Sequence, residues 1–328
     1  MRFSRYMNEW LYGEDGYYKH FKAIGKSGDF YTAVSASRFF GASIANYFLS
    51  LLKKNPAYRN GWLIEVGAHQ GYLLCDMIQW LYTCDPALMQ TLRFGIIERQ
   101  PDVQEAQRNY IKERFGDDIA VTHFNDIGEV EASYAFMVAN EIFDAFPCEL
   151  LKDEKIAIVE NHHIVWEDSP DEILQWAKSH HLKQGEIAVG YEEFAKAMSQ
   201  SIEHGDFVSF DYGEKYVRND FSIRIYRKHE TFPLFDESLV LEKSYQNDDI
   251  TYDVNFKHVA EAFIAAGFQE EAYETQARAL VRFGLMEILE QFAKKTTQSV
   301  YLREIDKIKT LLSPTMMGDR FKMIHFKK

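Results

Sequence analysis

The chain has 328 residues, of which 46% are hydrophobic and 27% charged, an ordinary globular composition with room for one large domain or two modest ones. Its formal net charge is −13 without a long Lys/Arg run, so we expect no nucleic-acid partner, because non-specific binding to nucleic acid requires a basic surface. No apolar stretch is long enough to cross a bilayer, and the N-terminus lacks the apolar core of a signal peptide. The three cysteines have neither metal nor disulfide spacing. We therefore expect a cytoplasmic protein without a membrane span.

Short apolar runs alternate with amphipathic stretches along most of the chain. An amphipathic helix is expected over 37–52, and strands over 62–66, 93–98, 119–123 and 134–139, with helices over 72–82 and 101–115 between them. A hairpin (156–159 and 163–166) and a mostly helical stretch (173–203) then precede a fifth core strand at 207–211. A helix over 255–266, a strand over 268–273, two helices over 276–312 and a strand-like 321–326 follow.

Strand–helix alternation of this kind predicts a doubly wound, mostly parallel Rossmann-like α/β sheet with right-handed crossovers. We expect a single domain over 1–328 rather than two separable ones. Its parts are an N-terminal helical cap (1–55), a wound cofactor-binding core (61–150 and 204–275), a central hairpin and helical insert (151–203) and a C-terminal extension (276–328).

The segment from Glu65 to Gly71 takes a strand into a glycine-bearing turn and then into a helix. Gly67 and Gly71 allow positive φ and a close approach of the backbone to a ligand. Glu98 ends the next strand, where a carboxylate can accept hydrogen bonds from both ribose hydroxyls. Asp126 follows the third strand and either meets a base or caps a helix. Together these residues predict a nucleoside cofactor at the carboxyl ends of the strands, and their spacing alone does not separate S-adenosylmethionine (AdoMet) from NAD.

Polar residues also cluster after the fourth strand. Asn140, Glu141 and Asp144 are expected beside the reactive centre of the cofactor, although Asn140 could instead cap the next helix. Carboxylates that face a guanidinium can orient it through bidentate hydrogen bonds and localise its charge, leaving one nitrogen more nucleophilic. Methyl transfer is then chiefly a matter of positioning.

Several short segments occur in a distinctive order over nearly the full chain. They are Gly16-Tyr17-Tyr18, Gly28-Asp29-Phe30, Glu65-x-Gly67, Asn140-Glu141-Ile142-Phe143-Asp144-Ala145-Phe146-Pro147, Asp211-Tyr212-Gly213, Asp249-Ile250-Thr251 and Met317-Gly318-Asp319-Arg320-Phe321-Lys322. In this order they resemble the MidA-like family, whose mitochondrial members are arginine methyltransferases that assist assembly of respiratory complex I. The resemblance implies the class I methyltransferase fold, AdoMet as methyl donor and a protein arginine as acceptor.

The resemblance also implies roles for single residues. It places Gly67, Gly71 and Glu98 at the cofactor, and the cap segment containing Asp29 over it. Glu141 and Asp144 would face the acceptor. The turn departs from the family's Gly-Pro-Gly-Arg-Gly pattern, because His69 stands where that pattern has its second glycine; His69 is either a steric replacement or a contact of the cofactor carboxylate. A further departure follows Phe30, where the sequence lacks the carboxylate that the family tends to carry.

We therefore expect an AdoMet-dependent protein arginine methyltransferase whose partner is a protein substrate, with a respiratory-complex subunit as one candidate and a homodimer as one open assembly. A catalytically silent assembly factor of the same fold is the alternative from another class, and the His69 substitution is its main motivation. A small-molecule methyltransferase is a third hypothesis. NAD-dependent redox chemistry is disfavoured, because no acid/base pair for hydride transfer can be named.

Overall fold

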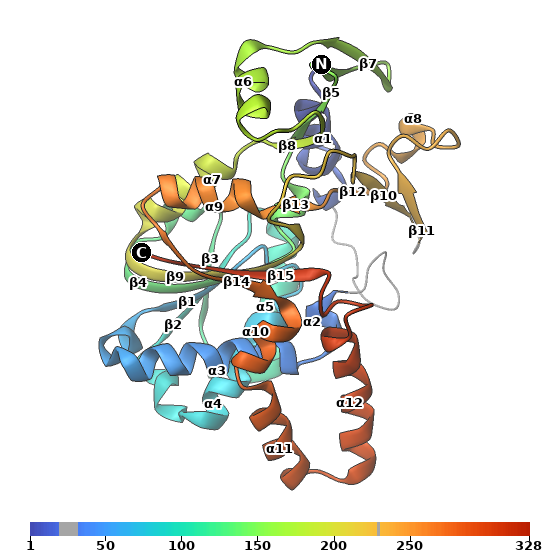
Figure 1. Ribbon diagram of the computed structural model, residues 1–328. Coiled ribbons are helices and arrows are strands. Elements are labelled where there is room, and N and C mark those ends of the chain that lie inside the picture. The colour runs from blue at the N-terminus through green and yellow to red at the C-terminus, as the bar shows by residue number, and fades with distance from the viewer. Residues whose placement is uncertain (20–31, 228–229) are drawn as a thin grey trace. The chain divides into compact units, whose positions relative to one another are not determined.

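The structure, a computed structural model, describes residues 1–19, 32–227 and 230–328 (Figure 1). Contacts between residues divide the chain into two compact units. We call the first the core unit, which comprises Tyr31–Glu141, Lys196–Asp211 and Phe263–Lys328. The second, the companion unit, comprises Met1–Phe30, Ile142–Ala195 and Tyr212–Ala262. The single domain expected from the sequence, with its cap, core, insert and extension, stays a prediction.

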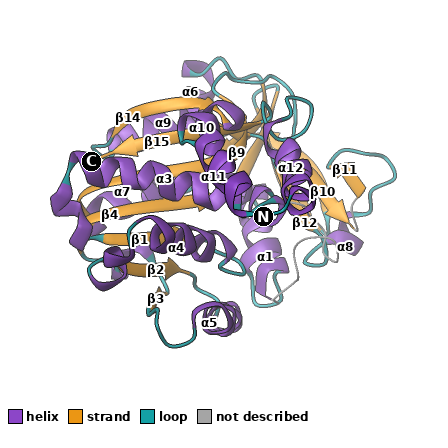
Figure 2. Cartoon of the chain, turned by 90° about the horizontal axis from the view of Figure 1, so that it is seen from below, coloured by secondary structure: helices purple, strands orange, loops and turns teal. Residues whose placement is uncertain are grey.

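The core unit is built on the central sheet. Its strands follow the order β14 (Gln269–Thr275), β15 (Phe321–Lys327), β9 (Ile202–Glu214), β4 (Ala132–Asn140), β1 (Trp62–Val66), β2 (Arg93–Ile97) and β3 (Val121–Phe124). The ladders β9–β4, β4–β1, β1–β2 and β2–β3 are all parallel, whereas β14 and β15 pair antiparallel. Figure 2 shows β4, β1, β2 and β3 side by side. The mostly parallel α/β fold predicted from the sequence is therefore confirmed.

Sequence and burial explain why these strands form. A strand buried on both faces reads as a continuous apolar run rather than an alternating one. In β4 the stretch from Ala135 to Ala139 is wholly buried. Aromatic rings fill the space between this sheet and α3 (Phe39–Lys54), where Phe48 packs on Phe136 and Phe40 on Phe210, with centroid distances of 4.8 and 4.9 Å. Figure 1 shows α3 and α4 (Tyr72–Cys84) on one face of the sheet.

The helices of the core unit largely lie where the pattern predicts them. Two helices were expected over 276–312, and this expectation is wrong, because Gly284 takes a left-handed φ of 91° and separates α10 from α11. The remaining helical segments of this unit are α2 (Ala33–Ala36), η2 (Pro56–Asn60), η3 (Pro86–Gln90), α5 (Pro101–Phe115), η4 (Ile127–Glu129), α10 (Gln276–Arg282), α11 (Leu285–Lys295) and α12 (Gln298–Leu312).

The companion unit holds two small antiparallel sheets. The expected hairpin is confirmed as β6 (Lys155–Glu160) and β7 (His163–Asp168), and it is extended by β5 (Cys148–Lys152) and β8 (Gln184–Ala188). The mostly helical stretch expected over 173–203 is therefore interrupted by a strand. The second sheet contains β11 (Glu230–Pro233), β10 (Arg224–Arg227) and β12 (Asp249–Thr251), and β13 (Val254–Asn255) pairs with the end of β9.

The helices of this unit are short. They are α1 (Phe3–Tyr12), η1 (Tyr17–Lys19), η5 (Phe143–Ala145), α6 (Asp171–Ser179) and α8 (Leu241–Ser244). Two further helices, α7 (Tyr191–Ser201) and α9 (Phe256–Ala265), contribute residues to both units. Across residues 1–19, 32–227 and 230–328, none of the helices has the length and apolar character that spanning a bilayer requires.

Candidate functional site

The predicted cofactor residues of the core unit follow neighbouring strands at one level of the sheet. Val66, the last residue of β1, pairs with Ile97 on one side and with Ala139 on the other. Consequently three residues lie at the same level of the sheet: Gly67 directly follows β1, Glu98 directly follows β2, and Asn140 is the last residue of β4. The strand order also reverses here, since β2 lies on one side of β1 and β4 on the other. A parallel sheet binds ligands at such a switch point, outside the carboxyl ends of its strands.

The turn after β1 has an unusual backbone. Gly67, His69 and Gly71 all have positive φ, at 68°, 45° and 75°. Glycine adopts this region freely, whereas a side chain makes it less favourable by about 1–2 kcal/mol. His69 therefore takes a glycine-like conformation, and its carbonyl oxygen accepts a 2.9 Å hydrogen bond from Nε2 of the buried Gln107. Gln107 on α5 thus holds the turn from outside its own segment.

We expect Gly71→Ala to lower the free energy of unfolding by about 1–2 kcal/mol through its backbone alone. An added Cβ would meet no atom closer than 3.7 Å, so the left-handed φ is the source of the cost. The shifted turn should also weaken AdoMet binding. Gly116→Ala is a control away from the turn, because Gly116, the C-cap of α5, also has a positive φ of 63° and open space around its Cβ position. Urea unfolding should show a loss of stability in both variants, and calorimetry should show weakened AdoMet binding only in Gly71→Ala. Unchanged AdoMet binding in Gly71→Ala would show that the turn does not contact the cofactor.

Glu65 lies within the sheet below this turn. Its side chain is 4% exposed, and its Oε2 accepts a 2.9 Å hydrogen bond from the backbone N–H of Leu74 in the first turn of α4. Burial raises the pKa of Glu65 from the ordinary 4.5 to about 8, against the lowering effect of the Leu74 hydrogen bond. Glu65 thus connects the end of β1 to the beginning of α4, and the direct cofactor contact expected for it stays a prediction.

Glu65 should make the stability of the cofactor-free protein fall as pH rises. Between its unfolded pKa of 4.5 and its folded value of about 8, the native state keeps a proton that the unfolded state has released, so the free energy of unfolding declines across this window. Glu65→Gln cannot titrate, so its stability relative to the parent chain should rise with pH, by up to about 1.4 kcal/mol per unit. Urea unfolding of both proteins at several pH values measures the difference. A constant difference would show that Glu65 does not titrate in this window.

Glu98 and Asn125 follow β2 and β3. Oε1 of Glu98 accepts a 3.0 Å hydrogen bond from the N–H of Gln100, and burial raises the pKa of this carboxyl while that hydrogen bond lowers it. The amide of Gln104 on α5 donates to the carbonyl oxygen of Glu98 and to Oδ1 of Asn125, at 2.6 and 3.1 Å. A carboxylate held in this way retains lone pairs for a ribose hydroxyl.

The capping alternative for Asp126 is confirmed. The Asp126 side chain is the N-cap of η4 and accepts a 2.8 Å hydrogen bond from the backbone N–H of Gly128. Its predicted contact with the cofactor base stays a prediction. Asp29 and the rest of the expected cap segment, 28–31, lie outside the described residues.

Asn140 is the last residue of β4, and Glu141 follows it. The capping alternative for Asn140 is wrong, since Asn140 is the last residue of the strand and its Nδ2 donates a 2.7 Å hydrogen bond to Oε1 of Glu141. Oδ1 of Asn140 is buried, and no residue in the described ranges donates to it. Glu141 has a left-handed φ of 56°, and its N–H donates to the carbonyl oxygen of Phe210 at 2.8 Å. A non-glycine residue held in this region at a strand end is a strained position of the kind that clusters at functional sites.

Asp144 belongs to the companion unit. Its side chain is buried, at 5% exposure, and Oδ2 accepts a hydrogen bond from the hydroxyl of Tyr212. Burial raises the pKa of this carboxyl, while the Tyr212 hydrogen bond and the Arg224 guanidinium lower it. Thr251 Oγ1 lies 2.6 Å from the same Tyr212 hydroxyl. The acceptor-facing role expected for Asp144 stays a prediction.

The arrangement within the core unit fits an adenosyl cofactor. Glycine and left-handed residues bend the β1–α4 turn, Glu98 presents a carboxylate one strand away, and Asn140 holds a buried acceptor without a partner in the described ranges. From Asn125 to Asn140 the set spans three strand spacings, or about 14 Å. Gln104 and Gln107 were missed by sequence reasoning, because each acts on a backbone carbonyl of another segment and carries no local signal.

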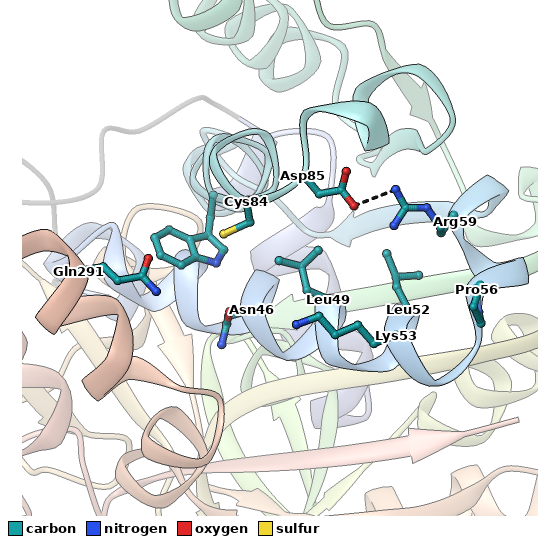
Figure 3. Close-up of a pocket in the computed structure, with 10 residues that line it drawn as sticks. Asn46, Leu49, Leu52, Lys53, Pro56, Arg59, Cys84, Asp85 and Gln291 are labelled. Carbon is teal, nitrogen blue, oxygen red and sulfur yellow. Dashed lines mark ion pairs between the residues drawn. The ribbon is translucent and has the colours of Figure 1, made fainter.

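A pocket of about 400 Å³ lies elsewhere in the core unit, among α3, α4 and α11 (Figure 3). Figure 3 shows Leu49 and Leu52 along one side of it and the Arg59–Asp85 ion pair, 2.8 Å long, at one end. None of the predicted site residues lines this pocket. Asp85 follows the end of α4 and precedes β2, so the pocket lies toward the ends at which the parallel strands begin.

Comparisons with known proteins agree with this geometry. Residues 43–273 match the model of a family described as S-adenosyl-L-methionine-dependent methyltransferase. A Rattus norvegicus protein named "Protein arginine methyltransferase NDUFAF7, mitochondrial" is 22% identical, with 97% of this chain and 79% of the rat protein covered. The Bos taurus protein of the same name is 29% identical over 44% of this chain and 37% of its own length. A crystal structure of a Burkholderia thailandensis protein bound to S-adenosyl-homocysteine has a TM-score of 0.84 at 22% identity, with 100% of this chain and 88% of that chain covered, and shows the same fold.

Proposed function

The chain belongs to the family of S-adenosyl-L-methionine-dependent methyltransferases, and on this premise we propose that it methylates the side-chain nitrogens of arginine in a protein. The family match agrees with the motifs of the sequence, and AdoMet is the cofactor. When bound, it supplies a methyl group on a sulfonium. The residues of the chain must then position the cofactor and the acceptor nitrogen for in-line transfer.

The position of Glu141 carries the proposal. Its carboxylate follows β4 at the switch point of the sheet, one strand from Gly67. Asn140 donates to Oε1, and the N–H of Glu141 is tied to Phe210, so the backbone and one carboxylate oxygen are both constrained. A fixed carboxylate suits a guanidinium, which binds carboxylates in a planar, bidentate manner. The names of the rat and cattle relatives support the same acceptor.

The direct test is the chemical identity of the methylated product. The purified chain is incubated with AdoMet that carries a tritiated methyl group and with extract from cells grown under conditions that limit methylation, and the extract proteins are then hydrolysed. We expect the label in ω-N-methylarginines. Label in methyllysine, or only in small molecules, would contradict the proposal and would favour the small-molecule methyltransferase in the second case.

A silent assembly factor is the second candidate, and a specific observation favours it. His69 places an imidazole in the cofactor turn at a φ of 45°, where its side chain could oppose close approach of the ligand to the backbone. Calorimetry with AdoMet separates the candidates, because a silent factor is expected to show no binding at millimolar cofactor.

We also propose a cytoplasmic location and a protein partner, with a respiratory-complex subunit as one candidate.

A further inference from the structure

Three aromatic side chains meet on the surface of the companion unit. We call Trp166, Phe221 and Phe235 the aromatic patch. The rings of Phe221 and Phe235 lie 4.7 Å apart, and Trp166 lies 6.0 Å from Phe221 and 6.1 Å from Phe235. Phe235 is 43% exposed and the other two are partly exposed. Ring clusters of this kind normally lie in a core, so their exposure indicates a surface that meets a partner.

The segments that carry the patch are held in place. Glu186 on β8 accepts hydrogen bonds from the N–H groups of Ser222 and Ile223, at 2.7 and 2.8 Å, and so fixes the segment after Phe221. The N–H of Leu234 donates to the carbonyl oxygen of Ile223 at 3.0 Å, which holds the segment of Phe235 against it. A backbone held by such contacts loses little conformational entropy when a partner binds.

Four carboxylates lie close to the residues of the aromatic patch along the chain. Asp168, Asp220, Asp236 and Glu237 each lie within two residues of one of its rings, and all four are exposed. On β7, Asp168 points to the same face as Trp166 because side chains alternate along a strand. Hydrogen bonds from Ser238 lower the pKa of Asp236. None of the four forms an ion pair with any residue of the described ranges.

Basic side chains near the patch leave this charge largely uncompensated. Lys155 stands opposite Asp168 across the β6–β7 ladder without forming an ion pair with it. The guanidinium of Arg218 is bound to Asp253, with a distance of 2.6 Å. Exposed aromatic faces near carboxylates that form no ion pair suit a cation with a flat, weakly hydrated surface, and the guanidinium of arginine has this character. Phosphate-bearing partners, such as nucleic acids or acidic membranes, would be repelled.

We propose that the aromatic patch is a docking surface for an arginine-bearing segment of a protein partner. The guanidinium would stack on Phe235 and Trp166 while the four carboxylates attract the segment. The identification of the partner as the methylation substrate rests on the proposed function. The new element is the surface at which that substrate first binds. Binding at the patch itself requires no cofactor.

The test uses the full chain and a short fluorescein-labelled peptide of alternating arginine and glycine, with its lysine and citrulline counterparts. Without cofactor, fluorescence anisotropy should show the arginine peptide binding more tightly than the lysine peptide, and far more tightly than the neutral citrulline peptide. Phe235→Ala should weaken binding of the arginine peptide by about 2- to 30-fold, the range of a cation–π contact. Because Phe235 is exposed, this variant should fold, and circular dichroism verifies that it does.

Tyr216→Ala is the matched control. Tyr216 is 63% exposed in the same unit and makes no ring contact with any residue of the described ranges, so peptide affinity should not change. The double variant Asp168→Asn, Glu237→Gln should weaken binding and reduce its dependence on salt, because exposed charges are screened by ions. Equal binding of the citrulline peptide, or an unchanged affinity in Phe235→Ala, would overturn the inference. Peptide binding without arginine methylation would instead overturn only the proposed function.

Discussion

Replacing Glu141 with glutamine is expected to reduce methyl transfer to arginine by about 100-fold or more, the scale that misplacement of a reacting group produces. Glutamine preserves the shape of the side chain and the oxygen that accepts from Asn140 Nδ2, so the end of β4 should keep its structure. What is lost is the negative charge that would orient the guanidinium and strengthen its hydrogen bonds. The rate is measured with labelled AdoMet under single-turnover conditions, and cofactor affinity by calorimetry.

Glu131→Gln is the control for this result. Glu131 immediately precedes β4 and is exposed, so the two glutamates flank the same strand at opposite ends. Turnover should be normal in Glu131→Gln, and AdoMet affinity should be nearly that of the parent chain in both variants. Normal turnover in Glu141→Gln would remove the acceptor-orienting role, and a parallel loss of cofactor affinity would reassign Glu141 to the cofactor.

The parts of the site that could be predicted from sequence are those with local signals. The run from Trp62 to Val66 is apolar except for Glu65 and is followed by glycines, and β1, the turn and α4 all form where this pattern places them. Glu98 was predicted because it ends an apolar run, although β2 itself ends at Ile97. The positive φ of Glu141 had no such signal, because it depends on the hydrogen bond to Phe210 in a distant strand.

The elements that were missed depend on distant pairing. β8 has the sequence Gln-Gly-Glu-Ile-Ala, which is poor in strand formers, and it exists because it pairs with β5 along five residues. The strands β10 and β12 are shorter still, with four and three residues, and stabilise one another. The break between α10 and α11 could have been found, since Gly284 interrupts the helical pattern. Short strands paired across the chain thus account for most of what the sequence did not reveal.

Replacing Glu98 with alanine is expected to weaken AdoMet binding by about 1.5–3 kcal/mol, or roughly 10- to 150-fold, because hydrogen bonds to a charged group contribute on this scale. Glu98 stands one strand from Gly67, and its carboxylate is positioned by the N–H of Gln100 while Gln104 holds its backbone carbonyl. The side chain is partly exposed, so its removal leaves no large cavity and should cost little stability.

The assignment of Glu98 to the ribose also predicts how the same variant binds the demethylated product. If Glu98 accepts hydrogen bonds from the ribose hydroxyls, Glu98→Ala should weaken the binding of S-adenosyl-homocysteine by the same factor as that of AdoMet. The two ligands share the ribose and differ only in the methyl group and its charge. A larger loss for AdoMet alone would mean that Glu98 responds to the sulfonium charge instead. Glu105→Ala provides the comparison, since Glu105 is an exposed residue of α5 and should leave both affinities unchanged. An unaltered dissociation constant for AdoMet in Glu98→Ala would show that the ribose does not bind Glu98 at the end of β2. The main support for a cofactor site at the ends of β1 and β2 would then be lost.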